Sequence, residues 1–75
     1  MTMITKCIAK WQSRGGKYWV ELYEQWKCEQ GRDVCEYSFH SENSGGFMGE
    51  VTLDKAVARC ELEASFAPSK MTRVK

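Results

Sequence analysis

The stretch KCIAKWQSRGGKYWVELYEQ, residues 6–25, is the part of the sequence that decides the fold. Two runs rich in β-branched and aromatic residues flank Gly15 and Gly16. Paired glycines supply the positive φ angles that a tight turn between antiparallel strands requires. We therefore predict a β-hairpin that turns at these two glycines.

The position of this turn also predicts the register of the hairpin. With the two glycines at the centre, the expected cross-strand pairs are Trp11 with Val20, Lys10 with Glu21, Ala9 with Leu22, and Ile8 with Tyr23. Lys10 and Glu21 carry opposite charges, and such a pair stabilises its register by roughly 0.2–1 kcal/mol.

A second turn is expected in the segment CEQGRDVC, which begins at Cys28. Centring this turn on Gly31 and Arg32 brings Cys28 opposite Cys35 and places a third strand at residues 34–41. In that register a disulfide between the two cysteines is geometrically conceivable. A reducing cytoplasm favours free thiols instead.

The only helix is expected in VTLDKAVARCELEASFAP, which ends at Pro68. Thr52 is the expected N-cap, and Asp54 lies in the first turn, where the helix dipole favours an anion. An apolar stripe at helical spacing predicts the buried side of this helix. Its members are Leu53, Ala56, Val57, Cys60 and Ala64.

These elements predict an α+β fold: a three-stranded antiparallel β-meander followed by one C-terminal α-helix packed on one face. The 75 residues form a single small domain, with a loose basic tail at residues 68–75. The first five residues, MTMIT, resemble the opening of bacterial β-galactosidase as carried on cloning vectors. A vector origin would leave residues 1–5 without information about the fold, and a chance likeness is the alternative.

Composition and charge restrict the class of protein. The chain is 43% hydrophobic and 12% aromatic, which argues against intrinsic disorder. Its formal net charge of +1 argues against a dedicated nucleic-acid binder, which usually carries a clear basic excess. The sequence contains neither a long apolar run nor a signal-peptide pattern, so we expect a cytoplasmic protein without a membrane partner. Its size suggests a prokaryotic or mobile-element protein.

Residues that commonly carry catalysis or bind metals are sparse. The four cysteines have long, irregular spacings without a C-x-x-C motif, so we expect Cys7, Cys35 and Cys60 to pack in the core. His40 is the only histidine, and no nucleophile and orienting group accompany it at a suitable spacing. We expect no catalytic residue, no metal, no cofactor and no enzymatic activity.

Side-chain alternation places large aromatic residues on both faces of the predicted sheet. One helix covers only one face, so the other is expected to leave Ile8, Trp19 and Tyr23 exposed beside Lys10 and His40. Exposed clusters of this kind usually mark an interface, and Trp and Tyr often carry interface energy. On the covered face, Glu24 points inward, which requires a nearby bulge, an edge position or a different register.

These observations predict a small non-enzymatic binding module that acts through protein–protein contact. It would either self-associate, for example as a homodimer, or serve as a stoichiometric inhibitor or adaptor. The expected partner-binding residues are Ile8, Lys10, Trp19, Tyr23, His40, Phe47 and Met48. Nucleic-acid binding by base stacking on Trp19 and Tyr23 is the alternative function. Two structural alternatives are that Leu62, Phe66 or the tail covers the aromatic face, and that Phe47 tucks under the helix.

Overall fold

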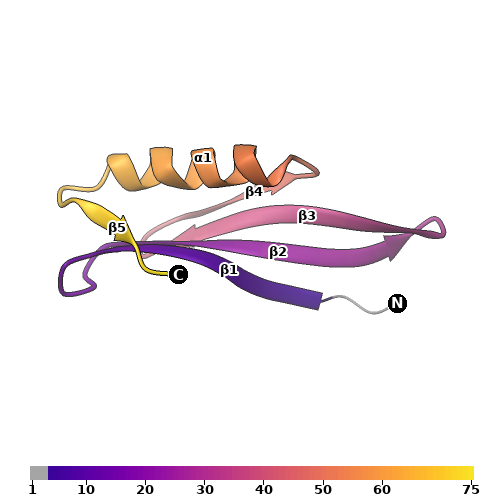
Figure 1. The fold of residues 1–75 in the computed structure, drawn as a ribbon, viewed down its shortest axis with the longest axis horizontal. Coiled ribbons are helices and arrows are strands. Elements are labelled where there is room, and N and C mark those ends of the chain that lie inside the picture. Colours follow the sequence, from indigo (N-terminus) through magenta and orange to yellow (C-terminus); the bar gives the residue numbers. More distant parts are fainter. Residues whose placement is uncertain (1–3) are drawn as a thin grey trace.

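The computed structural model describes residues 4–75, which form a five-stranded antiparallel sheet with one helix on one face (Figure 1). The elements are β1 (Ile4–Ser13), β2 (Trp19–Glu29), β3 (Arg32–Ser41), β4 (Gly45–Gly49), α1 (Leu53–Ser65) and β5 (Met71–Arg73). The strand order is β4-β3-β2-β1-β5. The predicted α+β class and the helix after the meander are confirmed. The prediction of only three strands is wrong.

The two additional strands extend the meander at both edges. β4 pairs with β3, in a segment whose glycines give no strand signal. Gly46 lies against the ring of Phe39, where an added Cβ would come within 2.6 Å of a ring carbon. β5 pairs with the last residues of β1, and Met71 packs against the core. The expectation of a loose tail is therefore wrong for Met71–Arg73.

The first hairpin has the predicted register near its turn. Trp11 pairs with Val20 and Ala9 with Leu22, as expected. Lys10 lies opposite Glu21, and its Nζ is 3.6 Å from the carboxylate. The ion pair between Lys10 and Glu21, which was used to predict this register, is therefore present in the structure.

Further along the same hairpin, a β-bulge at Ile8 changes the register. The pairing shifts between Cys7 and Ala9, so Cys7 rather than Ile8 lies opposite Tyr23. The extra residue inverts the alternation of the strand. Ile8 packs against the core on the helix side, and Cys7 lies on the other face. Our placement of these two residues is therefore wrong. A bulge was one of the explanations considered for the inward position of Glu24.

The second turn lies one residue earlier than predicted. Gln30 and Gly31 occupy it with φ angles of 53° and 78°, as a two-residue type I′ turn requires. The register consequently moves by two residues. Each side chain keeps its predicted face, because side chains alternate with a period of two.

The shifted register separates the two cysteines of this hairpin. Cys28 pairs with Asp33, and Cys35 pairs with Trp26. The prediction that Cys28 and Cys35 face each other is therefore wrong, and both are free thiols.

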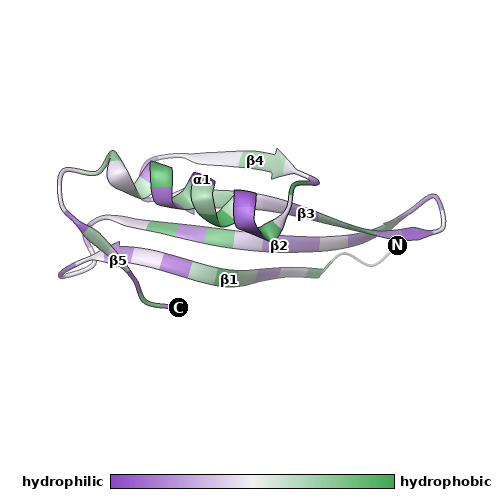
Figure 2. Cartoon of the chain, turned by 45° about the horizontal axis from the view of Figure 1, so that its top comes forward, coloured by the Kyte–Doolittle hydropathy of each residue, from purple (hydrophilic) through white to green (hydrophobic). Residues whose placement is uncertain are grey.

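The core lies between α1 and the adjacent face of the sheet. Its buried members are Ala9, Trp11, Val20, Leu22, Tyr37, Phe39, Ala56, Cys60 and Ala64. The three helix residues in this set are small, which lets α1 lie close to the strands. Thr52 caps the helix as predicted, since its Oγ1 accepts a hydrogen bond from the Lys55 backbone N–H at 3.2 Å. Figure 2 shows hydrophobic and hydrophilic residues alternating along β1 and β2.

The sheet is much longer than the helix. The molecule measures 44 × 19 × 19 Å, and the hairpin of β2 and β3 projects well beyond the start of α1 (Figure 1). We call this projecting part, residues 4–5, 25–29 and 32–36, the arm. We call the sheet face opposite α1 the outer face.

Candidate functional site

The outer face brings together four aromatic rings that the sequence placed there or in the neighbouring loop. We call them the aromatic cluster: Trp19, Tyr23, His40 and Phe47. Tyr23 and His40 lie on adjacent strands, with ring centroids 5.2 Å apart in an edge-to-face arrangement. Ser38 stands between Tyr23 and Phe47 in the same cross-strand row. Lys10 lies over the ring of Trp19, with Nζ 5.8 Å from its centroid.

Glu21 connects Tyr23 of this cluster to Lys10, and it was not among the predicted partner-binding residues. The Tyr23 hydroxyl donates a hydrogen bond to Glu21 Oε1 at 2.9 Å, and Lys10 approaches the same carboxylate. This hydrogen bond, together with burial, raises the pKa of Tyr23 above its usual value of 10.0. The sequence contained a signal for this link. Glu21 and Tyr23 are two residues apart and therefore share one face of β2, and Glu21 is the predicted cross-strand partner of Lys10.

A second ion-paired group lies on the outer face of the arm. Lys27 Nζ is 2.8 Å from Glu36 and 3.2 Å from Glu29. Both contacts raise the pKa of Lys27, and the hydrogen bond to Glu36 makes the larger contribution. Both Lys10 and Lys27 therefore have carboxylate partners, which reduces the positive potential of the face.

The aromatic cluster is accessible to a partner. Phe47 is 67% exposed and does not tuck under α1, so that alternative is wrong. His40 is exposed, and Trp19 and Tyr23 are partly buried. The proposed intramolecular cover is absent among residues 4–75. Leu62 and Phe66 remain exposed on the helix, and β5 lies at the sheet edge.

Ile8 and Met48 are separated from the other predicted partner-binding residues. Both are partly buried and pack against the core. Met48 is the extra residue of a second bulge, because the β3–β4 register shifts between Tyr37 with Gly49 and Ser38 with Phe47. The bulge at Ile8 turns its side chain from the predicted surface toward the helix side. Met48 lies on the helix side because it follows Phe47, which points to the outer face.

The cysteines do not form a reactive group within the described chain. Cys60 is fully buried, and burial raises the pKa of its thiol to about 11. Burial and a hydrogen bond with Cys35 raise the pKa of Tyr37 to about 12. Residues 4–75 contain no cluster of three or more His, Cys, Asp or Glu side chains that could hold a metal ion.

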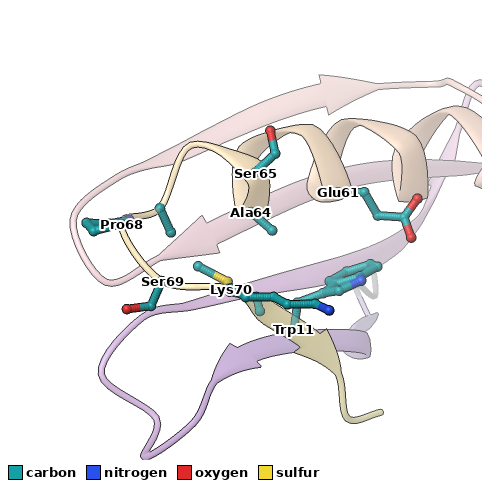
Figure 3. A pocket seen from close by; sticks show the side chains of 9 residues that line it. Trp11, Glu61, Ala64, Ser65, Pro68, Ser69 and Lys70 are labelled. Carbon is teal, nitrogen blue, oxygen red and sulfur yellow. The ribbon is translucent and has the colours of Figure 1, made fainter.

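A depression of about 420 Å³ lies under the C-terminal end of α1 (Figure 3). Trp11, Glu61, Ala64, Ser65, Ala67, Pro68, Ser69, Lys70 and Met71 line it. Trp11 is nearly fully buried and belongs to the core. The depression follows from the path of the chain between α1 and β5.

The fold and the exposed cluster define a small sheet-and-helix protein with one uncovered aromatic face. Comparisons with protein-family models, curated proteins and solved structures found no match to this chain. The helix within residues 4–75 is neither long enough nor apolar enough to cross a membrane.

Proposed function

We propose that this protein is a small non-enzymatic binding module that contacts another protein through its outer face. It acts as a stoichiometric inhibitor or adaptor, or by self-association. The exposure of the aromatic cluster on a face that α1 leaves uncovered carries this proposal. Rigid aromatic side chains on a regular sheet lose little conformational entropy on binding, and they commonly dominate interface energy.

The charges of the outer face favour a protein partner over nucleic acid. A nucleic-acid surface needs cations that are free to neutralise phosphates. Here Lys10 and Lys27 are paired with Glu21 and Glu36, and these carboxylates would themselves face the phosphates. Base stacking on Trp19 and Tyr23 is the alternative that the experiment must separate.

The test compares three proteins: wild type, the double variant Trp19→Ala with Tyr23→Ala, and Phe66→Ala as a control. Phe66 is an exposed aromatic residue at the end of α1, away from the outer face. Each protein is immobilised and exposed to nuclease-treated extract of the cells that express it, and circular dichroism checks folding. We expect a partner to bind wild type and the control stoichiometrically and to be lost from the double variant.

Equal retention by the folded double variant would show that the outer face is not the binding surface. Binding of single-stranded nucleic acid at low salt, lost in the same double variant, would favour the base-stacking alternative instead.

A further inference from the structure

The arm extends beyond the point where α1 begins (Figure 1). Its two exposed apolar residues, Ile4 and Trp26, form a cross-strand pair on the same side of the sheet as α1. Trp26 is 42% exposed there, and its strand neighbours are Ile4 and Cys35. Ile4 is 60% exposed, whereas Cys35 is partly buried and packs against the core. This surface is separate from the outer face, because Trp26 and the aromatic cluster lie on opposite sides of the sheet.

A groove lies next to this surface, between β1 and the first half of α1. It encloses about 520 Å³, and its apolar lining includes Ile8, Leu22, Leu53 and Val57. Leu53 is 48% exposed although it belongs to the predicted buried stripe. β5 pairs only with Trp11–Ser13, so it does not close the groove along the rest of β1.

The chain exposes more surface than a compact protein of its size. A folded protein of 8.6 kDa exposes about 4,700 Å², whereas this chain exposes 5147 Å². Its radius of gyration is 13.2 Å, against about 11 Å expected for this length. A standard dimer buries about 800 Å² per partner, so docking the arm in a second molecule would remove more than this excess.

We propose that a second copy of this chain occupies the groove, with Trp26 of each copy inserted between β1 and α1 of the other. A projecting Trp and a groove side by side on one surface suit a two-fold contact. Rotation about an axis between them places each Trp26 in the groove of the partner copy. The net charge of +1 leaves little repulsion between two copies.

The charges around the groove also fit this arrangement. Glu24, Asp54 and Glu61 line it together with Lys6 and Arg73. No ion pair within residues 4–75 joins these carboxylates to a cation. Because the groove is lined by both acidic and basic side chains, a two-fold rotation can bring acidic side chains of one copy next to basic side chains of the other.

The experiment measures self-association by sedimentation equilibrium with two variants. Trp26→Thr removes the projecting ring and keeps a residue that favours strands. Ala58→Arg fills the groove from an exposed helix position with a good helix former. We expect wild type at twice the 8.6 kDa monomer mass. Each variant should raise the dimer dissociation constant at least about 30-fold.

Mixing the two variants gives a sharper result than either alone. The Trp26→Thr copy keeps a groove, and the Ala58→Arg copy keeps a projecting Trp, so one contact of the two can form. We expect the mixture to associate more tightly than either variant by itself and more weakly than wild type. Phe66→Ala, which changes an exposed aromatic residue outside this surface, should dimerise as wild type does.

A monomeric wild type would overturn the proposal and leave the arm as a surface for a different protein. A dimer that persists in folded Trp26→Thr would also overturn it. Dissociation by Trp19→Ala with Tyr23→Ala, but not by Trp26→Thr, would assign self-association to the outer face. The proposed function is tested separately: if Trp26→Thr still binds a partner through the outer face, the loss of dimerisation in this variant does not count against the proposed function.

Discussion

Tyr23 lies edge-on to His40, with ring centroids 5.2 Å apart, and this contact joins β2 to β3 on the face that α1 does not cover. The Tyr23 hydroxyl at the same time donates to Glu21. The ring is thus held by an aromatic contact on one strand and a hydrogen bond along its own strand. A binding surface built in this way is ordered before a partner arrives, which reduces the entropy lost on binding.

Removing the Glu21 carboxylate should lower the pKa of Tyr23. In Glu21→Gln the carboxylate charge that disfavours the phenolate is gone, so the phenol should titrate closer to its usual value of 10.0. Ultraviolet titration of wild type and variant measures this shift, with Tyr23→Phe identifying the signal. An unchanged Tyr23 titration would mean that the hydrogen bond to Glu21 does not form in solution.

Gly46→Ala should destabilise the protein by about 1–3 kcal/mol, because the new Cβ would overlap the ring of Phe39. Urea unfolding measures the loss. The matched test is the same substitution in a Phe39→Leu background, where the ring is absent. The two substitutions should then be strongly non-additive, and additive effects would place the origin of the loss elsewhere.

The Phe39–Gly46 contact also explains why β4 could not be predicted. Strand signals come from β-branched and aromatic residues, and a glycine selected for close approach to a ring has neither property. β5 in the C-terminal tail was equally hard to predict from the sequence, because it has only three residues and forms only through pairing with the edge of β1. By contrast, paired glycines, alternating aromatics and one opposite-charge pair were sufficient to predict the first hairpin.

Local backbone irregularities limited the prediction of the candidate site. Simple alternation placed Trp19, Tyr23 and His40 on one face, where the structure has them. The bulge at Ile8 inverted that alternation, and an isoleucine does not indicate a bulge. Met48 was expected in an exposed loop, whereas it follows Phe47 in β4 and packs against the core. Gln30 shifted the second turn by adopting a positive φ of 53°, which is uncommon for a residue other than glycine.

Thr52→Ala should lower the free energy of unfolding by about 1 kcal/mol. The Thr52 hydroxyl accepts a hydrogen bond from the Lys55 backbone N–H, which has no partner within the first turn of a helix. Thr52→Ser keeps that acceptor and should retain most of the stability. Chemical denaturation of both variants measures the difference, and an equal loss in the two would point to the lost methyl group instead of the cap.

Alkaline pH should weaken the fold through Cys60, which is fully buried against the sheet. Burial raises the pKa of its thiol from 9.0 to about 11, so the folded state holds this proton more tightly than the unfolded chain does. The resulting stabilisation is fully present below pH 9 and is lost as the pH rises through about 11. We expect the free energy of unfolding to fall by about 2 kcal/mol between these values.

Cys60→Ala provides the control for this pH dependence. The variant loses some stability at every pH because it removes a buried sulfur, but it has no buried thiol at position 60 to titrate. Urea denaturation at a series of pH values should therefore give a flatter profile for the variant between pH 9 and 11. The hydroxyl of Tyr37, whose pKa is raised from 10.0 to about 12, adds a loss of the same sign between about pH 10 and 12 in both proteins, so it does not contribute to the difference between their profiles. Parallel profiles for wild type and Cys60→Ala would exclude the thiol as the cause of alkaline destabilisation.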